Sequence, residues 1–294
     1  MHLHRPPKNT RGQQKIKSMK ILDKDVLADH QGVRIVRLTI QTPEIAAKAK
    51  AGQFVVLMVR EEGERVPLTI VKADPEKGTI VLIAQEAGLT TRLLAGVHAG
   101  DSLHSIVGPL GHPTEIKKYG KVILVGGGVG IAEIYPVARA LKNAGNHVTS
   151  IIGSRTKELL ILERELKEAS SECIVMSDDG SYGRKGFVTE ALKELLEKSK
   201  VDLVYAVGPI PMMRAVSTVT KPFGVATLVS LNAIMVDGTG MCGCCRVTVA
   251  GKVKFSCVDG PEFDAAQVDW QELLNRNSIY TEKEKHICRL KDKA

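Results

Sequence analysis

Aromatic residues and long apolar runs are scarce in this sequence. Phe, Trp and Tyr together make up 4% of the 294 residues, and there is a single Trp. So few aromatic side chains leave little surface on which unpaired bases could stack. No run approaches the roughly 20 apolar residues of a membrane-spanning helix, and the first residues lack the apolar core of a signal peptide. We therefore expect a cytoplasmic protein that binds neither nucleic acid nor membranes.

Acidic residues are missing from the first twenty positions, whereas six basic residues stand there. The formal charge of the chain is +8, so these six leave only +2 for everything after them. The basic character therefore belongs mainly to an N-terminal extension, residues 1–18. A charge confined to a tail does not give the remaining chain a nucleic-acid surface.

Two apolar patterns divide the rest of the chain. From 19 to 115, apolar and polar residues alternate in short runs such as VRIVRLTI and TIVLIAQ, which predicts a small antiparallel barrel. From 116 to 228, apolar runs such as KVILVGG alternate with helical patterns such as IYPVARALKNAG and LLILERELKEA. That alternation predicts a parallel sheet covered by helices on both faces. The expected fold class is β followed by α/β, with a cysteine-rich segment at 229–265 and a tail at 266–294.

The stretch VILVGGGVGIAEIYP places glycines directly between a predicted strand and a predicted helix. Backbone amides free of Cβ hindrance and a helix N-terminus together favour a bound phosphate. Ile131 stands where the third glycine of a GxGxxG motif belongs, and no acid ends the next strand. A tight turn without a ligand is the alternative. The phosphate candidates are Gly127, Gly128 and Gly130, with Ser154 and Arg155 at the end of the next strand.

Four of the six cysteines lie between positions 242 and 257. In a reducing compartment, clustered cysteines indicate metal binding or catalysis more often than disulfides. An all-thiolate zinc site that includes Cys244 is one possibility. Cys173 and Cys288 stand apart from the group, and we expect no metal role for them.

A barrel followed by a glycine-rich nucleotide fold resembles the ferredoxin-NADP reductase superfamily, in which the barrel holds a flavin. The stretches ERVPLT and EAGLTT match its flavin-binding segments. The resemblance implies that Thr69 hydrogen-bonds a flavin ring nitrogen, and that an edge of the second domain approaches the nicotinamide. The implied FAD contacts are Arg65, Val66, Pro67, Leu68, Thr69, Gly88 and Thr91, and the implied nicotinamide contacts are Gly208 and Pro209.

The cysteine segment is similar to that of the electron-transfer subunit of dihydroorotate dehydrogenase. There, a C-x4-C-x2-C spacing and one distant cysteine hold a 2Fe-2S cluster. On that frame Cys242, Cys245 and Cys257 match, while Asp237 stands at the first ligand position. A carboxylate oxygen can ligate iron, although it is a harder donor than a thiolate. Cys244 remains an alternative to Asp237.

The Asp-for-Cys replacement, with GERVPLTI and SDDGSYGRKGFVTE, most resembles the small subunits of electron-bifurcating NADH-dependent reduced ferredoxin:NADP oxidoreductases. The resemblance implies FAD, NAD(H) and one 2Fe-2S cluster. It also implies a larger iron-sulfur flavoprotein subunit, through which ferredoxin and NADP(H) react. Apolar residues of the C-terminal tail such as Trp270, Leu273 and Leu274 indicate docking on that partner, and packing of the tail on its own chain is the alternative. Cofactors carry the chemistry, so no side chain is nominated as a catalytic acid or base.

Glu133 departs from the relatives' pattern, in which proline is common at this position. An acid in the first helical turn would compete with a bound phosphate for the positive helix end. Two other functions remain open: a dihydroorotate dehydrogenase-type electron-transfer subunit, and a zinc-stabilised interaction protein without enzymatic activity.

Overall fold

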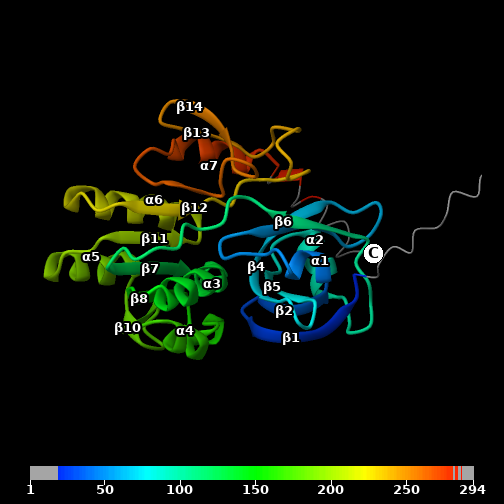
Figure 1. Ribbon diagram of the computed structural model, residues 1–294, viewed down its shortest axis with the longest axis horizontal. Helices are drawn as coiled ribbons and strands as arrows, with labels where there is room; N and C mark the ends of the chain where they lie inside the picture. The colour runs from blue at the N-terminus through cyan, green and yellow to red at the C-terminus, as the bar shows by residue number, and fades with distance from the viewer. Residues whose placement is uncertain (1–18, 281, 284–285, 287–294) are drawn as a thin grey trace, which may run out of the picture.

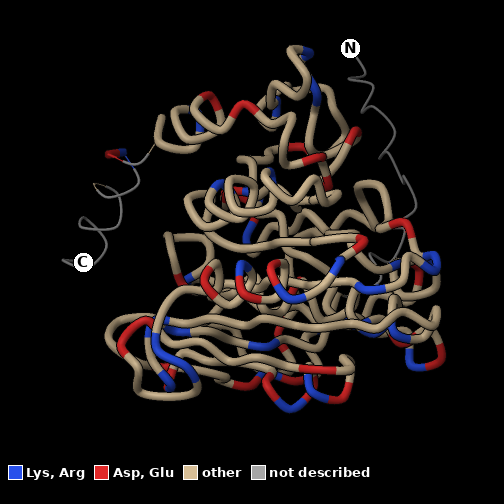
Figure 2. Tube along the Cα trace, turned by 90° about the vertical axis from the view of Figure 1, so that its left-hand side faces the viewer, with Lys and Arg blue, Asp and Glu red and all other residues tan. Residues whose placement is uncertain are grey.

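The computed structural model describes residues 19–280, 282, 283 and 286. The N-terminal extension, Cys288 and most of the tail after residue 280 lie outside the described residues. A barrel and a nucleotide-type domain lie side by side, and a smaller segment with α7 lies against both (Figure 1). Lys and Arg are interspersed with Asp and Glu along the chain rather than separated by sign (Figure 2). Within the described residues, every helix is too short or too polar to span a bilayer.

The first domain is a six-stranded antiparallel sheet with the order β1-β2-β5-β4-β3-β6. A bridge between Lys20 and Ser102 links its two edges. The alternation seen in the sequence places one face of each strand inside, where Leu38, Leu57 and Leu82 are fully buried. The elements are β1 (Ile21–His30), β2 (Val33–Gln41), α1 (Pro43–Ala46), β3 (Phe54–Met58), β4 (Arg65–Asp74), β5 (Thr79–Gln85), α2 (Leu89–Ala95) and β6 (Ser105–Leu110).

The second domain has a seven-stranded sheet with the order β10-β9-β8-β7-β11-β12-β15, parallel except where β15 pairs with β12. Ile123 and Val125 of β7 pack in one core with α5 and α6, and Val122 and Leu124 pack with α3 and α4 in another. Helices therefore cover both faces. The elements are β7 (Lys121–Gly127), α3 (Gly130–Asn143), β8 (His147–Ser154), η1 (Lys157–Leu159), α4 (Glu163–Ala169), β9 (Glu172–Ser177), β10 (Arg184–Lys185), α5 (Val188–Lys198), β11 (Leu203–Val207), α6 (Ile210–Thr220), η2 (Lys221–Phe223), β12 (Thr227–Ser230) and β15 (Glu262–Asp264).

The cysteine-rich segment leaves the sheet after β12 and returns to it at β15. Between them stands a hairpin of β13 (Arg246–Val249) and β14 (Lys252–Phe255), and α7 (Trp270–Ser278) follows. Leu273 of α7 is fully buried, and Trp270 Nε1 donates a hydrogen bond of 3.2 Å to the Ala265 carbonyl. Helix α7 thus packs on its own chain, which leaves Ile279 and Tyr280 as exposed apolar residues just after it.

The helix predicted from LLILERELKEA is wrong in its first half, because α4 begins only at Glu163. Leu162 has a φ of 54°, a left-handed conformation that interrupts any helix. Leu159 and Ile161 are buried in the core beneath α3 and α4. Their apolar character therefore reflects a packed connection and not a helical face.

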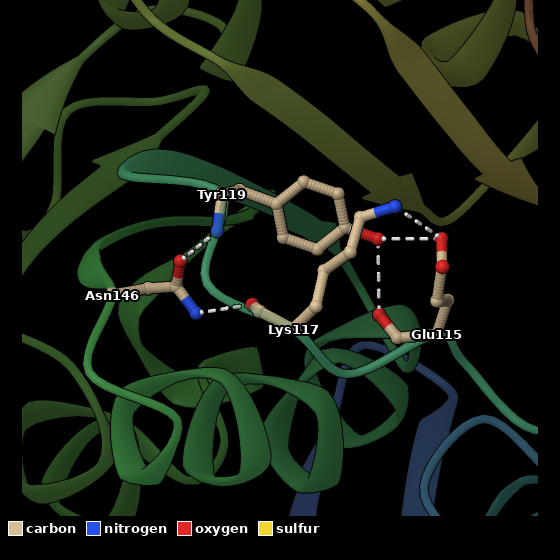
Figure 3. A network of polar contacts seen from close by, with 4 residues as sticks. All are labelled: Glu115, Lys117, Tyr119 and Asn146. Atoms are coloured by element: carbon tan, nitrogen blue, oxygen red, sulfur yellow. Dashed lines mark hydrogen bonds and ion pairs between the residues drawn. The ribbon is translucent and has the colours of Figure 1, made fainter.

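A short linker between the two domains is held by a polar network (Figure 3). The Asn146 side chain accepts a hydrogen bond of 2.7 Å from the Tyr119 amide and donates one of 2.9 Å to the Lys117 carbonyl. The Tyr119 hydroxyl donates to both the carbonyl and the carboxylate of Glu115. Burial first, and then the Glu115 charge, raise the pKa of Tyr119 to about 12. These contacts fix the direction in which the chain enters β7.

Candidate functional site

A cleft of about 280 Å³ lies where the barrel, α3 and the stretch after β12 meet. The barrel contributes Phe54 and residues 67–69, α3 contributes Ala132 and Glu133, and the third wall is formed by residues 230–233 and 235. Most of the lining is apolar, with a few polar groups, as in typical sites for planar cofactors. The structure thus brings predicted flavin contacts from β4 next to the helix that follows the glycine-rich turn.

Thr69 points across this cleft to Glu133. Its Oγ1 donates a hydrogen bond of 3.0 Å to Glu133 Oε2, which joins the barrel to α3. Loss of hydration raises the pKa of Glu133 to about 7, although the bond from Thr69 acts in the opposite direction. Glu133 was expected to compete for phosphate at the helix end. Its carboxylate instead bonds to the barrel.

At two positions near the turn between β7 and α3, neighbouring atoms come so close that only glycine fits without a shift. A Cβ on Gly130 would lie 2.4 Å from the Val207 carbonyl oxygen, and one on Gly127 would lie 2.3 Å from Met212 Sδ. Gly128 differs, because it has a φ of 57° and open space within 4 Å of an added Cβ. Gly127 and Gly130 therefore permit the packing of the turn, and Gly128 faces the space that a phosphate could fill.

The remaining barrel candidates lie in the first part of β4 and at the start of α2. Arg65 is exposed at the start of β4, and Val66, Pro67 and Leu68 follow it half-buried. Gly88 begins α2, with open space around an added Cβ. Thr91 Oγ1 accepts hydrogen bonds from the Ala87 and Gly88 amides, at 2.9 and 3.0 Å, and so caps α2.

The nucleotide candidates at the ends of β8 and β11 lie at the carboxyl ends of the two parallel strands that flank β7. Ser154 is buried and donates a hydrogen bond of 2.7 Å to the Thr156 carbonyl, so its hydroxyl is already used. Arg155 is exposed, and its charge opposes the burial that raises the pKa of Asp178. Gly208 and Pro209 follow β11 and lead into α6.

Asp237 organises the loop that carries the first cysteine. Its Oδ1 accepts a hydrogen bond of 2.8 Å from the Thr239 amide, and its Oδ2 accepts one of 2.9 Å from the Cys242 amide. These amide bonds lower the pKa of Asp237. Gly238 and Gly240 have φ values of 75° and 85°, left-handed conformations that let the loop turn tightly around the carboxylate.

Cys245 and Cys257 face each other in the interior with a Sγ–Sγ distance of 3.2 Å, whereas Cys242 is exposed. Burial raises the pKa of Cys257 to about 12, and a bond from the Gly240 amide acts in the opposite direction. The Cys257 amide in turn donates to Cys245 Sγ at 3.5 Å. Amides directed at sulfur suit an iron-sulfur cluster.

The candidate ligands therefore form two pairs, Asp237 with Cys242 and Cys245 with Cys257. Among the residues that the structure describes, no three Cys, His, Asp or Glu side chains converge as ligands of one metal ion do. Cys244 is half-buried, and its carbonyl accepts a hydrogen bond of 3.0 Å from Arg276. Cys173 is also half-buried, on β9 and far along the chain from this segment.

Two family models match these parts of the chain. The oxidoreductase NAD-binding domain matches residues 124–218, and the iron-sulfur cluster binding domain of dihydroorotate dehydrogenase B matches residues 232–269. A dihydroorotate dehydrogenase B electron transfer subunit homolog from Thermotoga maritima is 51% identical over 246 residues, covering 84% of this chain and 87% of that protein. The chain belongs to this family of electron transfer subunits.

Other relatives agree with this assignment. The dihydroorotate dehydrogenase B electron transfer subunit of Geobacillus thermodenitrificans is 34% identical over 244 residues. The match covers 80% of the present chain and 93% of the Geobacillus protein. A solved NADH-dependent reduced ferredoxin-NADP oxidoreductase, described for flavin-based electron bifurcation, superposes with a TM-score of 0.86 and 48% identity over 91% of this chain and 95% of that chain. The predicted resemblance and the β plus α/β fold are confirmed. This chain is an oxidoreductase subunit with an NAD-binding and an iron-sulfur domain.

Sequence reasoning missed two features of the site. One is the bond between Thr69 and Glu133, which joins residues 64 positions apart and has no local signature. The other is Glu262, a half-buried carboxylate that accepts hydrogen bonds from Tyr205, at 2.9 Å, and from Thr114. No clear signal for Glu262 was present in the sequence, because it is one of three acidic residues in the stretch DGPEFDAA.

Gly128→Ala should weaken nucleotide binding beyond its effect on stability. Gly224 is a matched control, because it has a φ of 61° and open space around an added Cβ, but lies after η2, far from the turn. Both alanines should lower the free energy of unfolding by about 1–2 kcal/mol. Only Gly128→Ala should weaken NADH binding, measured by calorimetry beside thermal melting. Equal NADH affinities in the two variants would show that no phosphate lies at Gly128.

Proposed function

We propose that this chain passes electrons from NADH through FAD to a 2Fe-2S cluster, as the small subunit of an electron-bifurcating NADH-dependent reduced ferredoxin:NADP oxidoreductase. The observation that carries the proposal is the cleft itself. Flavin-type contacts on β4, the turn before α3 and the stretch leading into the cysteine loop all border one space. A hydride donor, a flavin and a cluster ligand loop would therefore be neighbours.

Bound FAD supplies the conversion between two-electron and one-electron transfer. The chain's own residues position the groups. Residues 66–69 would lie along the flavin ring, and the space beside Gly88 and Gly128 would receive phosphates. The apolar walls exclude water from the reacting faces, which protects a hydride in transit.

Two pairs of donors suit a two-iron cluster, in which each iron takes two protein ligands. Cys245 and Cys257 would bind one iron, and Asp237 and Cys242 the other. The first pair is buried and the second is at the surface. The cluster would thus connect the interior to the exterior of the molecule.

NADH is the proposed hydride donor, because Arg155, which could bind the 2'-phosphate of NADPH, lies near a carboxylate. Arg155 shares its surroundings with the carboxyl of Asp178. A phosphate there would meet that carboxylate as well as the arginine.

NADH should therefore reduce the purified holoprotein at least tenfold more efficiently than NADPH, a difference of about 1.4 kcal/mol. Asp178→Asn should raise the efficiency with NADPH more than that with NADH. Asp179→Asn is the matched control, since that neighbouring carboxylate bonds to Ser181. Bleaching of flavin and iron-sulfur absorption by each nucleotide is the measurement. A clear preference for NADPH in the unaltered protein contradicts the proposed donor, and no bleaching with either nucleotide contradicts the proposed function.

Asp237→Ala should lower bound iron and Cys244→Ala should leave it unchanged, if the two ligand pairs are right. Asp237→Asn keeps the size of the side chain and one of its two loop bonds, because its single oxygen can accept from either the Thr239 or the Cys242 amide. It should also destabilise the cluster, since a neutral amide is a weaker iron ligand than a carboxylate. Iron and acid-labile sulfide per chain are measured. Loss of iron in Cys244→Ala with retention in Asp237→Ala would reverse the assignment.

The proposed partner is a larger iron-sulfur flavoprotein subunit that carries ferredoxin and NADP(H) chemistry. Exposed apolar residues surround Cys242, with Met241 88%, Val236 42% and Val258 40% exposed. An added Cβ on Gly240 would touch Val258, so the loop and this valine lie together. Apolar residues beside a surface ligand suit an interface through which electrons leave.

Met241→Glu should reduce assembly with the larger subunit, because the interface would then bury an unpaired charge. Val253→Glu is the control, since Val253 is 59% exposed on the neighbouring hairpin. Co-purification of the two subunits in equal amounts is measured, with iron content as a check of the cluster. If Met241→Glu assembles as fully as the unaltered chain, this face is not the interface. A dihydroorotate dehydrogenase catalytic subunit as the co-purifying partner would instead favour the function named for the curated relatives.

A further inference from the structure

Glu133 is the one charged side chain among the described residues that line the cleft. It lies in the first turn of α3, and its Oε2 accepts the hydrogen bond from Thr69 Oγ1 of β4. Thr69 reaches the same cleft from the barrel wall. A hydroxyl and a carboxylate in contact can exchange a proton without any movement of the backbone.

The surroundings of Glu133 allow it to change charge near neutral pH. Burial raises its pKa to about 7, and the Thr69 bond opposes that change. Of the elements packed against α3, β11 contributes Tyr205, whose pKa lies well above the ordinary value mainly through burial, so it stays neutral. In the described chain, no charged side chain of β4, β7, β8 or α4 shifts the pKa of Glu133.

We propose that Thr69 and Glu133 hold and pass the proton that accompanies electron transfer in this cleft. The inference rests on the proposed function, in which a hydride enters and single electrons leave. Oxidation of NADH to NAD⁺ delivers two electrons and one proton as a hydride. An iron-sulfur cluster takes electrons one at a time and takes no proton, so one proton per hydride would have to leave a flavin bound in the cleft, and Thr69 lines that cleft and could take it.

Thr69 Oγ1 accepts that proton while its own hydroxyl proton passes to Glu133 Oε2, which turns the carboxylate into a carboxylic acid. No other bond forms or breaks, and the two electrons leave by way of the cluster. Glu133 is half-buried, so its acid form can release the proton to water at the open side of the cleft. In the opposite direction of electron flow the same two oxygens deliver the proton.

The first test needs no cofactor. The infrared carbonyl band of a protonated carboxyl should titrate near pH 7 in the flavin-free protein, as the pKa of Glu133 requires. Glu133→Gln should remove that band, and Glu168→Gln, an exposed glutamate on α4, should leave it. Because the folded pKa is raised, the melting temperature of the unaltered protein should fall relative to Glu133→Gln as the pH rises from about 5 to about 8. Absence of the band, or its persistence in Glu133→Gln, would overturn the assignment.

The second test uses the holoprotein. The rate of cluster reduction by NADH should change across neutral pH in the unaltered protein, and that change should disappear in Glu133→Gln. Thr69→Val should also abolish it while keeping the infrared band, and Thr69→Ser should restore it. A purely structural role for the pair would alter stability and leave the pH profile unchanged, which would refute the relay. If NADH fails to reduce the unaltered holoprotein, the proposed function fails and the relay fails with it, whereas the infrared band still reports whether Glu133 titrates.

Discussion

The half-buried carboxylate of Glu262 is the point at which the barrel, the nucleotide-type domain and the cysteine segment meet. It lies on β15 and accepts hydrogen bonds from Tyr205 of β11 and from Thr114 of the linker. The barrel turn at Gly52 comes so close that an added Cβ would lie 2.7 Å from the same oxygen. Removal of either donor would take one of these two hydrogen bonds from a carboxylate that is poorly hydrated, which is destabilising. The three parts are therefore held in one arrangement, and the cleft between them keeps its shape.

Close backbone approach is a second constraint, and it explains why the turn after β7 is so rich in glycine. Gly130 lies against the carbonyl of Val207 at the end of β11, so α3 can sit directly over the sheet. That position brings Glu133 within reach of Thr69 on the barrel. Gly130, which permits this packing, thus also helps to place Glu133 at the cleft.

Most strands of the barrel and of the parallel sheet, and the helices between the parallel strands, could be predicted from the sequence, because their apolar periods are local and strong. The hairpin of β13 and β14 and the return strand β15 were not predicted. Leu159 and Ile161 misled that reasoning, since a packed connection and a helix face present the same apolar letters. The candidate ligands could be placed from spacing and resemblance, but the amide bonds of Asp237 could not, because they depend on loop conformation. The hydrogen bond between Glu133 and Thr69 could not be predicted from the sequence. Whether the carboxylate faces the helix end or the barrel is decided only when the two domains pack.

The path from the cleft to the cluster loop follows from how the chain leaves and rejoins the sheet. Ser230 ends β12 and pairs with Glu262 at the start of β15, so the whole cysteine segment begins and ends at neighbouring positions. Residues 230–233 and 235 line the cleft, and Asp237 follows two positions later. Gly238 in turn packs on Val56 of the barrel. The loop that would hold the cluster is therefore anchored on both domains that form the cleft. A short electron path is then a consequence of strand pairing, and Glu262 secures it by fixing the position at which the segment returns.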